Sequence, residues 1–139
     1  MPLLLRRSAY VLFREKKMKK VSESAENYLE TILVLSKRKG SVRAIDIANE
    51  LDFSKPSVSI ALKHLREQGH VVISEDGVLS LTESGRRIAE GIYERHLVLT
   101  RFFTSLGVDE DIAQADACKI EHILDPQTFN AIKRSLKDR

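Results

Sequence analysis

Residues 54–81 leave little freedom in how this chain can fold, because a helical pattern gives way there to an extended one. Ser54 offers a hydroxyl that can cap a helix, and Pro56 fits the first turn because its missing N–H has no intrahelical partner there. Apolar residues then recur at helical spacing as far as Gly69, a natural helix terminator. Two short β-prone runs follow, separated by Asp76-Gly77, which is a hairpin signal. The segment predicts a helix followed by a two-stranded hairpin.

Two further helical patterns precede this segment. Residues 24–38 carry an apolar stripe that ends near Lys39-Gly40, which predicts a first helix. Residues 42–51 place Ile47 and Leu51 one turn apart, which predicts a short second helix. Three helices followed by a hairpin are the layout of a winged helix-turn-helix, whose third helix enters the major groove of DNA.

The third predicted helix carries side chains suited to nucleic acid. Ser54 and Ser57 at its start suit phosphate or base-edge contacts, and Lys55 and Lys63 suit phosphates. The alternative is an amphipathic helix whose polar residues merely face solvent. The complete order of elements, rather than this helix alone, favours DNA binding.

The chain after the hairpin is expected to be entirely helical. Thr82 can cap a long helix, Asp109 opens a second, and Asp125-Pro126 opens a last one. We therefore expect a mainly α protein, with a winged helix-turn-helix DNA-binding domain over 22–81 and an all-helical domain over 82–139.

Composition limits the classes of protein to which this chain can belong. Its 139 residues suffice for a hydrophobic core, and its apolar fraction of 42% is ordinary for a soluble protein. No run approaches the roughly 20 apolar residues that a membrane span needs. A single cysteine cannot form an internal disulfide, which fits a reducing compartment. We expect a cytoplasmic protein with no membrane partner.

Positive charge is concentrated at the N-terminus. The first 20 residues hold seven Lys and Arg against one acid, although the whole chain carries only +3, so the remainder is net acidic. We expect residues 1–21 to be a basic extension that is disordered or results from a misplaced start, because Met18 followed by Lys19 and Lys20 would make a natural beginning. A basic arm that grips phosphates is the alternative.

A metal-ligand pattern lies in the run AQADACKIEHILD. Cys118, Glu121 and His122 stand at i, i+3 and i+4, so a continuous helix would aim a thiolate, a carboxylate and an imidazole at one point. Cys, Glu and His sharing one face rarely serves packing, although Cys118 alone would most often be a small buried hydrophobe. A metal site coupled to a DNA-reading helix predicts a metal-sensing transcription factor.

Three ligands are too few, because a transition ion bound by side chains usually takes four to six. Two further candidates stand out by residue type. His96 lies on the long helix after the hairpin, and Glu30 lies on the first helix, with Asn27 one turn earlier on the same face. A lone helical histidine is more often a hydrogen-bonded structural residue, and spacing alone does not show that these side chains converge.

At this point the chain resembles a known family, the metal-activated bacterial repressors of the diphtheria-toxin-repressor and manganese-transport-regulator type. The resemblance covers about residues 22–136 and rests on four runs: AENYLETI, DIANELDFSKPSVSIALKHLREQGHV, LTESGRRIAEGIYERH and GVDEDIAQADACKIEHIL. It implies a homodimer joined through the helices after the wing, a Fe2+ or Mn2+ site between the first helix and the later helices, and a palindromic double-stranded DNA operator. It also implies that the protein represses metal-uptake genes.

The resemblance assigns the metal ligands by position. Cys118, Glu121 and His122 match three liganding positions, and the Cys is what the iron-responsive branch shows there. His96 matches a liganding histidine, and Glu30 matches a glutamate that binds metal in the manganese branch. Asn27 stands where the family places Met or Asp, and an amide oxygen is a weaker ligand.

Other positions depart from the iron branch. Thr100 and Gln114 replace a Glu and a His of an ancillary metal site, so we expect that second site to be altered or weak. Ser54, Pro56 and Ser57 match positions that approach bases or phosphates, whereas Ile60 replaces a glutamine near the bases and is expected to read DNA by methyl contact and shape. The chain also ends before the SH3-like domain that the iron branch often appends, so we expect the short, two-domain form.

The donor set bears on the metal, and two other functions compete. A thiolate beside imidazole and carboxylate favours Fe2+, Co2+, Ni2+ or Zn2+, whereas Glu30 and Asn27 favour harder ions, so we expect Fe2+ with Mn2+ close behind. One competitor is a metal-independent or redox-sensing winged-helix transcription factor that uses Cys118. The other is a small metalloenzyme. The sequence argues against it, because it contains no nucleophile-base pair and no Gly-rich phosphate loop.

Overall fold

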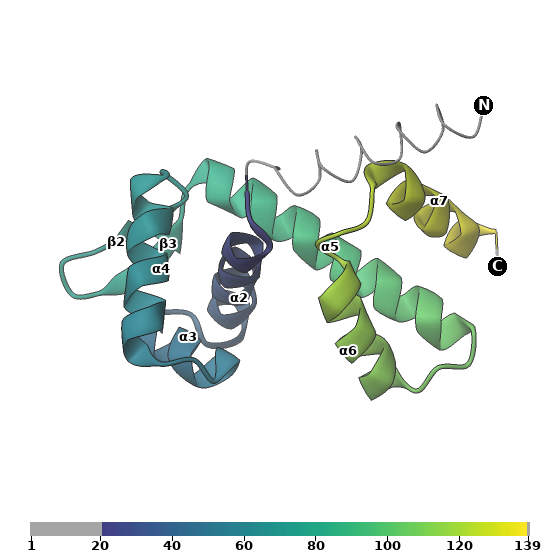
Figure 1. Ribbon diagram of the computed structural model, residues 1–139, viewed down its shortest axis with the longest axis horizontal. Coiled ribbons are helices and arrows are strands. Elements are labelled where there is room, and N and C mark those ends of the chain that lie inside the picture. Colours follow the sequence, from purple (N-terminus) through teal and green to yellow (C-terminus); the bar gives the residue numbers. More distant parts are fainter. Residues whose placement is uncertain (1–20, 139) are drawn as a thin grey trace, which may run out of the picture.

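The computed structural model describes residues 21–138, and the basic extension expected over 1–21 lies outside the described residues except for Val21. Six helices and three strands form the described chain (Figure 1). In chain order they are α2 (Glu23–Lys39), β1 (Val42–Arg43), α3 (Ala44–Leu51), α4 (Lys55–Glu67), β2 (Val71–Ile73), β3 (Val78–Leu81), α5 (Glu83–Ser105), α6 (Glu110–Ile120) and α7 (Pro126–Lys137). The predicted fold class is therefore confirmed: mainly helical, with a winged helix-turn-helix before an all-helical part.

Local side-chain chemistry sets where most helices begin. Side-chain oxygens accept bonds from backbone N–H groups at the starts of α2, α4, α5 and α7, and these capping residues are Ser22, Ser54, Thr82 and Asp125. Such a cap satisfies one of the N–H groups that the first helical turn leaves without a partner. Pro residues at the starts of α4 and α7 fit for the same reason.

The hairpin belongs to a three-stranded antiparallel sheet in the order β1-β3-β2. Val71 pairs with Leu81 in the hairpin, and Val42 pairs with Leu79 on the other side of β3. The prediction of a helix over 42–51 is wrong at its first two residues, because Val42 gains a fully buried position by pairing with β3. Helix α3 begins only at Ala44.

One hydrophobic core joins the winged part, which runs from α2 to β3, to the long helix α5. Buried residues of α2, α3, α4 and the sheet form this core together with Ala89 of α5. Figure 1 shows α5 running from the winged part to the far end of the molecule, where α6 and α7 lie beside it. Helix α2 therefore packs on the same helix that carries the C-terminal elements, and the boundary near residue 82 stays a prediction.

Helix α6 ends earlier than the metal pattern requires. Its last helical residue is Ile120, Glu121 is its C-cap, and His122 lies in the following turn. After this turn Asp125 caps α7 and Pro126 occupies its first turn, so a new helix begins there. The prediction of one continuous helix from Cys118 to His122 is therefore wrong.

Among the described residues, no helix combines the length and the apolar character required to cross a membrane.

Candidate metal centre and DNA-binding surface

The predicted ligands come together as two groups that share one residue. His96, Cys118 and Glu121 form one group, and Glu30, Glu121 and His122 form the other, with one ligand atom from each residue within 4.8 Å of the others. The expectation that Cys118, Glu121 and His122 aim at a single point is wrong, because α6 ends before His122, and Cys118 and His122 fall in different groups. Glu121 joins the two groups.

The Glu121 side chain is the most buried of these donors, with no solvent exposure. Its Oε2 lies 2.9 Å from His96 Nδ1, whereas its Oε1 lies 3.5 Å from His122 Nε2 and has no hydrogen-bond partner among the described residues. A buried carboxylate oxygen without a partner is costly and uncommon. This orphaned oxygen, surrounded by other donors, fits a site for a cation.

The neighbours of Glu121 titrate abnormally. Burial first, and then the nearby Glu121 carboxylate, raise the pKa of Glu30 to about 8. Hydrogen bonding to Cys118 first, and then to Glu121, raises the pKa of His96 to about 10. Both groups thus hold a proton at neutral pH, because positive charge or a bridging proton relieves the repulsion between buried donors. A divalent cation would do the same, which again fits a metal site.

Helix α2 brings two carboxylates to this centre. Glu30 is buried at 7% exposure, and Glu26, one turn earlier, places its Oε1 3.1 Å from His122 Nδ1. Sequence reasoning missed Glu26. The signal was available, because residues at i and i+4 share one face of a helix and Glu30 was already a candidate.

Two of the predicted ligands, Asn27 and Cys118, are less buried than Glu30 and Glu121. Asn27 is half-buried on α2, and its backbone carbonyl accepts a bond from Thr31 Oγ1 at 2.7 Å. A role for its side chain amide stays a prediction. Cys118 is exposed on α6, so its thiol is open to an entering ion or an oxidant rather than buried as a small hydrophobe.

Arg95 holds the ligand-bearing turn against α5. Its Nη1 donates to the backbone carbonyls of Glu121 at 3.0 Å and Leu124 at 2.6 Å, and its guanidinium lies over the ring of Phe129, 5.1 Å from the centroid. One side chain of α5 therefore fixes both the end of α6 and the start of α7. Sequence reasoning missed this residue too, because the contact spans 26 positions or more.

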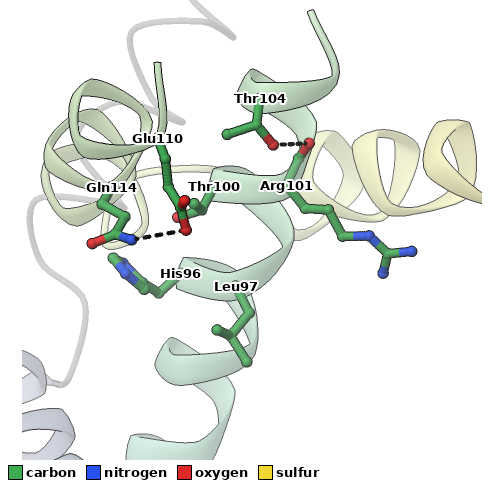
Figure 2. A pocket seen from close by; sticks show the side chains of 7 residues that line it. All are labelled: His96, Leu97, Thr100, Arg101, Thr104, Glu110 and Gln114. Carbon is green, nitrogen blue, oxygen red and sulfur yellow. Dashed lines mark hydrogen bonds between the residues drawn. The ribbon is translucent and has the colours of Figure 1, made fainter. Parts of the chain in front are cut away.

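A cavity of about 360 Å³ lies beside His96, between α5 and α6. Figure 2 shows Thr100 and His96 from α5 and Gln114 and Glu110 from α6 facing this space. Gln114 Nε2 donates to Glu110 Oε1 at 3.4 Å, and Thr100 Oγ1 is buried without a partner among the described residues. Thr100 and Gln114 bring no charge to this cavity, and the altered or weak second site stays a prediction.

The six predicted DNA contacts lie at the start and along the exposed face of α4, and all six are exposed: Ser54, Lys55, Pro56, Ser57, Ile60 and Lys63. Ile60 is 60% exposed, which is unusual for a large aliphatic side chain. Ser54 and Ser57 bond to each other through their hydroxyls at 2.8 Å. Arg43 of β1 donates to the Asp76 carbonyl and ties the wing tip to the sheet beside α3. The structure thus presents a polar helix face next to an anchored wing.

Comparison with known proteins agrees with this architecture. The family model for the iron dependent repressor N-terminal DNA binding domain matches residues 20–79, and the model for the iron dependent repressor metal binding and dimerisation domain matches residues 82–139. The transcriptional regulator MntR of Escherichia coli is 31% identical over 121 residues, which cover 87% of this chain and 78% of that protein. The diphtheria toxin repressor of Corynebacterium diphtheriae is 30% identical over 122 residues, which cover 87% of this chain and 54% of that protein.

Solved structures give the same result. The manganese regulator SloR superposes with a TM-score of 0.72 at 25% identity, over 81% of this chain and 53% of that one. The IdeR protein of T. acidophilum superposes with a TM-score of 0.72 at 25% identity, over 86% of this chain and 56% of that one. This chain therefore spans about half the length of those two proteins. On these matches and on the two-part architecture that they share, the chain belongs to the iron-dependent repressor family.

Proposed function

We propose that this protein is a cytoplasmic, homodimeric repressor of metal-uptake genes that binds a palindromic DNA operator when a divalent cation occupies the centre around Glu121. The observation that carries this proposal is the orphaned Oε1 of Glu121, which lies fully buried between donors of α2, α5 and the end of α6. A cation there would link the winged part to the C-terminal helices. Binding energy at the centre could then set the position of α4.

The proposed ligands are Glu30, His96, Cys118, Glu121 and His122, with Asn27 as a weaker contributor. When bound, the cation supplies the positive charge that protons on Glu30 and His96 otherwise supply. Glu121 faces both groups of donors, so it is the ligand whose loss affects them all. With Thr100 and Gln114 in place of a Glu and a His, we expect the second site to be altered or weak.

The donor set and the relatives support Fe2+ or Mn2+. The Cys118 thiolate favours Fe2+ over Mn2+, while two buried carboxylates suit Mn2+ as well. Two solved relatives are linked to manganese: the manganese regulator SloR, and a manganese-dependent transcriptional repressor in complex with manganese that superposes at 27% identity with a TM-score of 0.73. We expect Fe2+ to be the physiological metal, with Mn2+ close behind, and Zn2+, Co2+ and Ni2+ to bind in vitro.

The winged part supplies the DNA contacts of the proposal. Lys55 and Lys63 contact phosphates from the exposed side of α4, and Ser54, Pro56 and Ser57 approach the DNA at the helix start. Ile60 reads the bases by methyl contact. A repressor of this kind needs no catalytic group, and we propose no enzymatic activity.

The test is fluorescence anisotropy on the protein's own upstream DNA at fixed salt, with a chelator and then with anaerobic Fe2+, Mn2+ or Zn2+. We expect a tightening of tenfold or more, about 1.4 kcal/mol of coupling. Glu121→Gln removes the charge at nearly constant volume and should abolish the response. Glu90→Gln is the matched control, because Glu90 is an exposed residue of α5 that pairs with Arg86 at 3.6 Å.

Two results would contradict the proposal. An equal metal response in Glu121→Gln and wild type would reject the site. DNA binding that is unaffected by chelator but weakened by oxidant would favour the redox-sensing regulator. The exposed Cys118 thiol supports this second candidate.

A further inference from the structure

Glu26 contacts the candidate centre from outside its two donor groups. Its Oε1 lies 3.1 Å from His122 Nδ1, and both side chains are mostly buried, at 13% and 7% exposure. The atoms of Glu26 are absent from both groups of converging donors found among the described residues. Glu26 therefore touches a proposed ligand but is a member of neither donor group.

This contact selects one form of the imidazole. A carboxylate can only accept a hydrogen bond, so the Nδ1 of His122 must carry the proton and donate it to Glu26. In the neutral ring the lone pair then lies on Nε2, which faces Glu121 Oε1 across 3.5 Å. Glu121 Oε1 receives no hydrogen bond in the described part of the chain, so two acceptor atoms face each other. A proton or a metal cation can lie between two such acceptors, and a metal cation would use the lone pairs of both.

We propose that Glu26 is a positioning residue that holds His122 in its ligand form and transmits occupancy of the centre to α2. This inference rests on the proposed function. When Nε2 of a histidine binds a cation, its Nδ1–H becomes a stronger donor to the carboxylate behind it. The Glu26 bond therefore strengthens on metal binding and draws α2 toward the turn after α6. Since α2 packs in the core of the winged part, this movement acts on the DNA-binding elements.

Glu26 and Glu30, both on α2, contribute to the centre in different ways. Glu30 offers a carboxylate to the centre itself, together with Glu121 and His122. Glu26 holds the opposite edge of the His122 ring. Because coupling between two sites is reciprocal, a residue that tightens α2 on metal binding also raises metal affinity when DNA is bound.

The experiment uses the whole chain with three substitutions. Glu26→Ala removes the acceptor, Glu26→Gln keeps an acceptor oxygen but removes the charge, and Glu23→Ala is the control, because Glu23 is an exposed acid of the same helix. The first readout is the tautomer of His122 in the metal-free protein, from ¹⁵N NMR of the imidazole. The second is Co2+ affinity from its visible absorption bands, and the third is DNA affinity by anisotropy with and without Co2+.

We expect a protonated Nδ1 in wild type, Glu26→Gln and Glu23→Ala, and a mixture of tautomers in Glu26→Ala. Loss of such a supporting carboxylate typically weakens metal binding by about 10- to 100-fold. Glu26→Ala should show that loss, Glu26→Gln a smaller one, and Glu23→Ala none. The metal-induced gain in DNA affinity should shrink in the same order.

Two results would overturn the role of Glu26: an unchanged His122 tautomer in Glu26→Ala, or Co2+ affinity equal to that of Glu23→Ala. If Glu26→Ala does not fold, the Glu26→Gln affinity decides alone, since equality with wild type rejects the proposal. If wild type binds Co2+ without any change in DNA affinity, the proposed function fails. The transmitting role fails with it, while the tautomer and the Co2+ affinities still decide whether Glu26 positions His122.

Discussion

Glu121 is the buried charge on which the electrostatics of the candidate centre depend. It is fully buried, it touches His96, and its Oε1 has no hydrogen-bond partner among the described residues although it lies 3.5 Å from His122 Nε2. Burial raises the pKa of Glu30 and hydrogen bonding to Cys118 raises the pKa of His96, and Glu121 raises both further. The metal-free centre is therefore held together by protons that a cation can replace.

This arrangement predicts that the metal-free protein loses stability as pH rises from 6 to 9. The pKa of Glu30 rises from 4.5 to about 8 on folding, so its contribution is complete below about 4.5 and is lost through about pH 8. The pKa of His96 rises from 6.5 to about 10, so its contribution is complete below 6.5 and is lost through about pH 10. Both changes have the same sign, because the folded state binds more protons than the unfolded one.

The measurement is the Tm of chelator-treated protein at pH 6, 7, 8 and 9, repeated with saturating Mn2+. We expect the Tm to fall with pH in chelator and the gain from Mn2+ to grow with pH, because fewer protons need to be displaced. Glu30→Gln should flatten the chelator curve, and Glu75→Gln, at the exposed wing turn, should leave it unchanged. A Tm that rises over this range in chelator would refute the proton-held centre.

Element by element, the fold depends on where helices end and where they touch. The first turn of helix α5 packs against the loop that precedes the hairpin. A Cβ added to Gly85 would overlap the backbone carbonyl of His70 in that loop. Around this contact, Ser84 bonds to His70 Nδ1 at 2.9 Å and Thr82 bonds to the Gly69 carbonyl at 2.7 Å. The base of the wing is thus packed onto the first turn of α5 with no room for a side chain.

We predict opposite effects of alanine at two glycines of α5. Gly85→Ala should destabilise the protein by about 1–3 kcal/mol, because the His70 backbone must move. Gly91→Ala should stabilise it by roughly 0.5–1 kcal/mol, since nothing lies near its added methyl and alanine is the better helix former. Urea unfolding of both variants against wild type makes the measurement, and equal free energies of unfolding would contradict the contact.

In the molecule as a whole, helix α5 connects the winged part to the C-terminal helices. The exposed face of α4 lies in the winged part, while the centre around Glu121 lies between α2 and the C-terminal helices. Exposed aliphatic residues also occur in the C-terminal part, among them Leu97, Leu106 and Ile112. The family description of this part as a dimerisation domain agrees with such a surface.

At this scale we predict that Lys63→Ala weakens binding to all DNA sequences alike. Lys63 is exposed on α4, and a lost phosphate contact reduces the dependence of log K on log salt by about 0.9 for each contact. The measurement is anisotropy at several salt concentrations on operator and on scrambled DNA. Lys133→Ala is the control, because Lys133 pairs with Glu94 at 2.8 Å in the C-terminal part. A loss confined to the operator would instead make Lys63 a base-reading residue.

Local patterns in the sequence were enough to predict most elements. The caps at Ser54, Thr82 and Asp125, the hairpin turn and the spacing of apolar residues act within one or two helical turns, so they can be read without knowing the fold. Spacing within one or two helical turns also identified the run that holds Cys118, Glu121 and His122. It also placed Glu30 and His96 among the candidates by type and by resemblance.

Only the tertiary structure decided how these pieces meet. Strand β1 exists because Val42 pairs with Leu79, a contact across 37 positions that no local pattern indicates. Cys118 and His122 belong to different donor groups because α6 ends at Ile120, where Arg95 of α5 holds the turn. Glu26 reaches His122 across 96 positions. Short-range preferences select helices and turns, but buried charge and long-range packing determine which donors share a site.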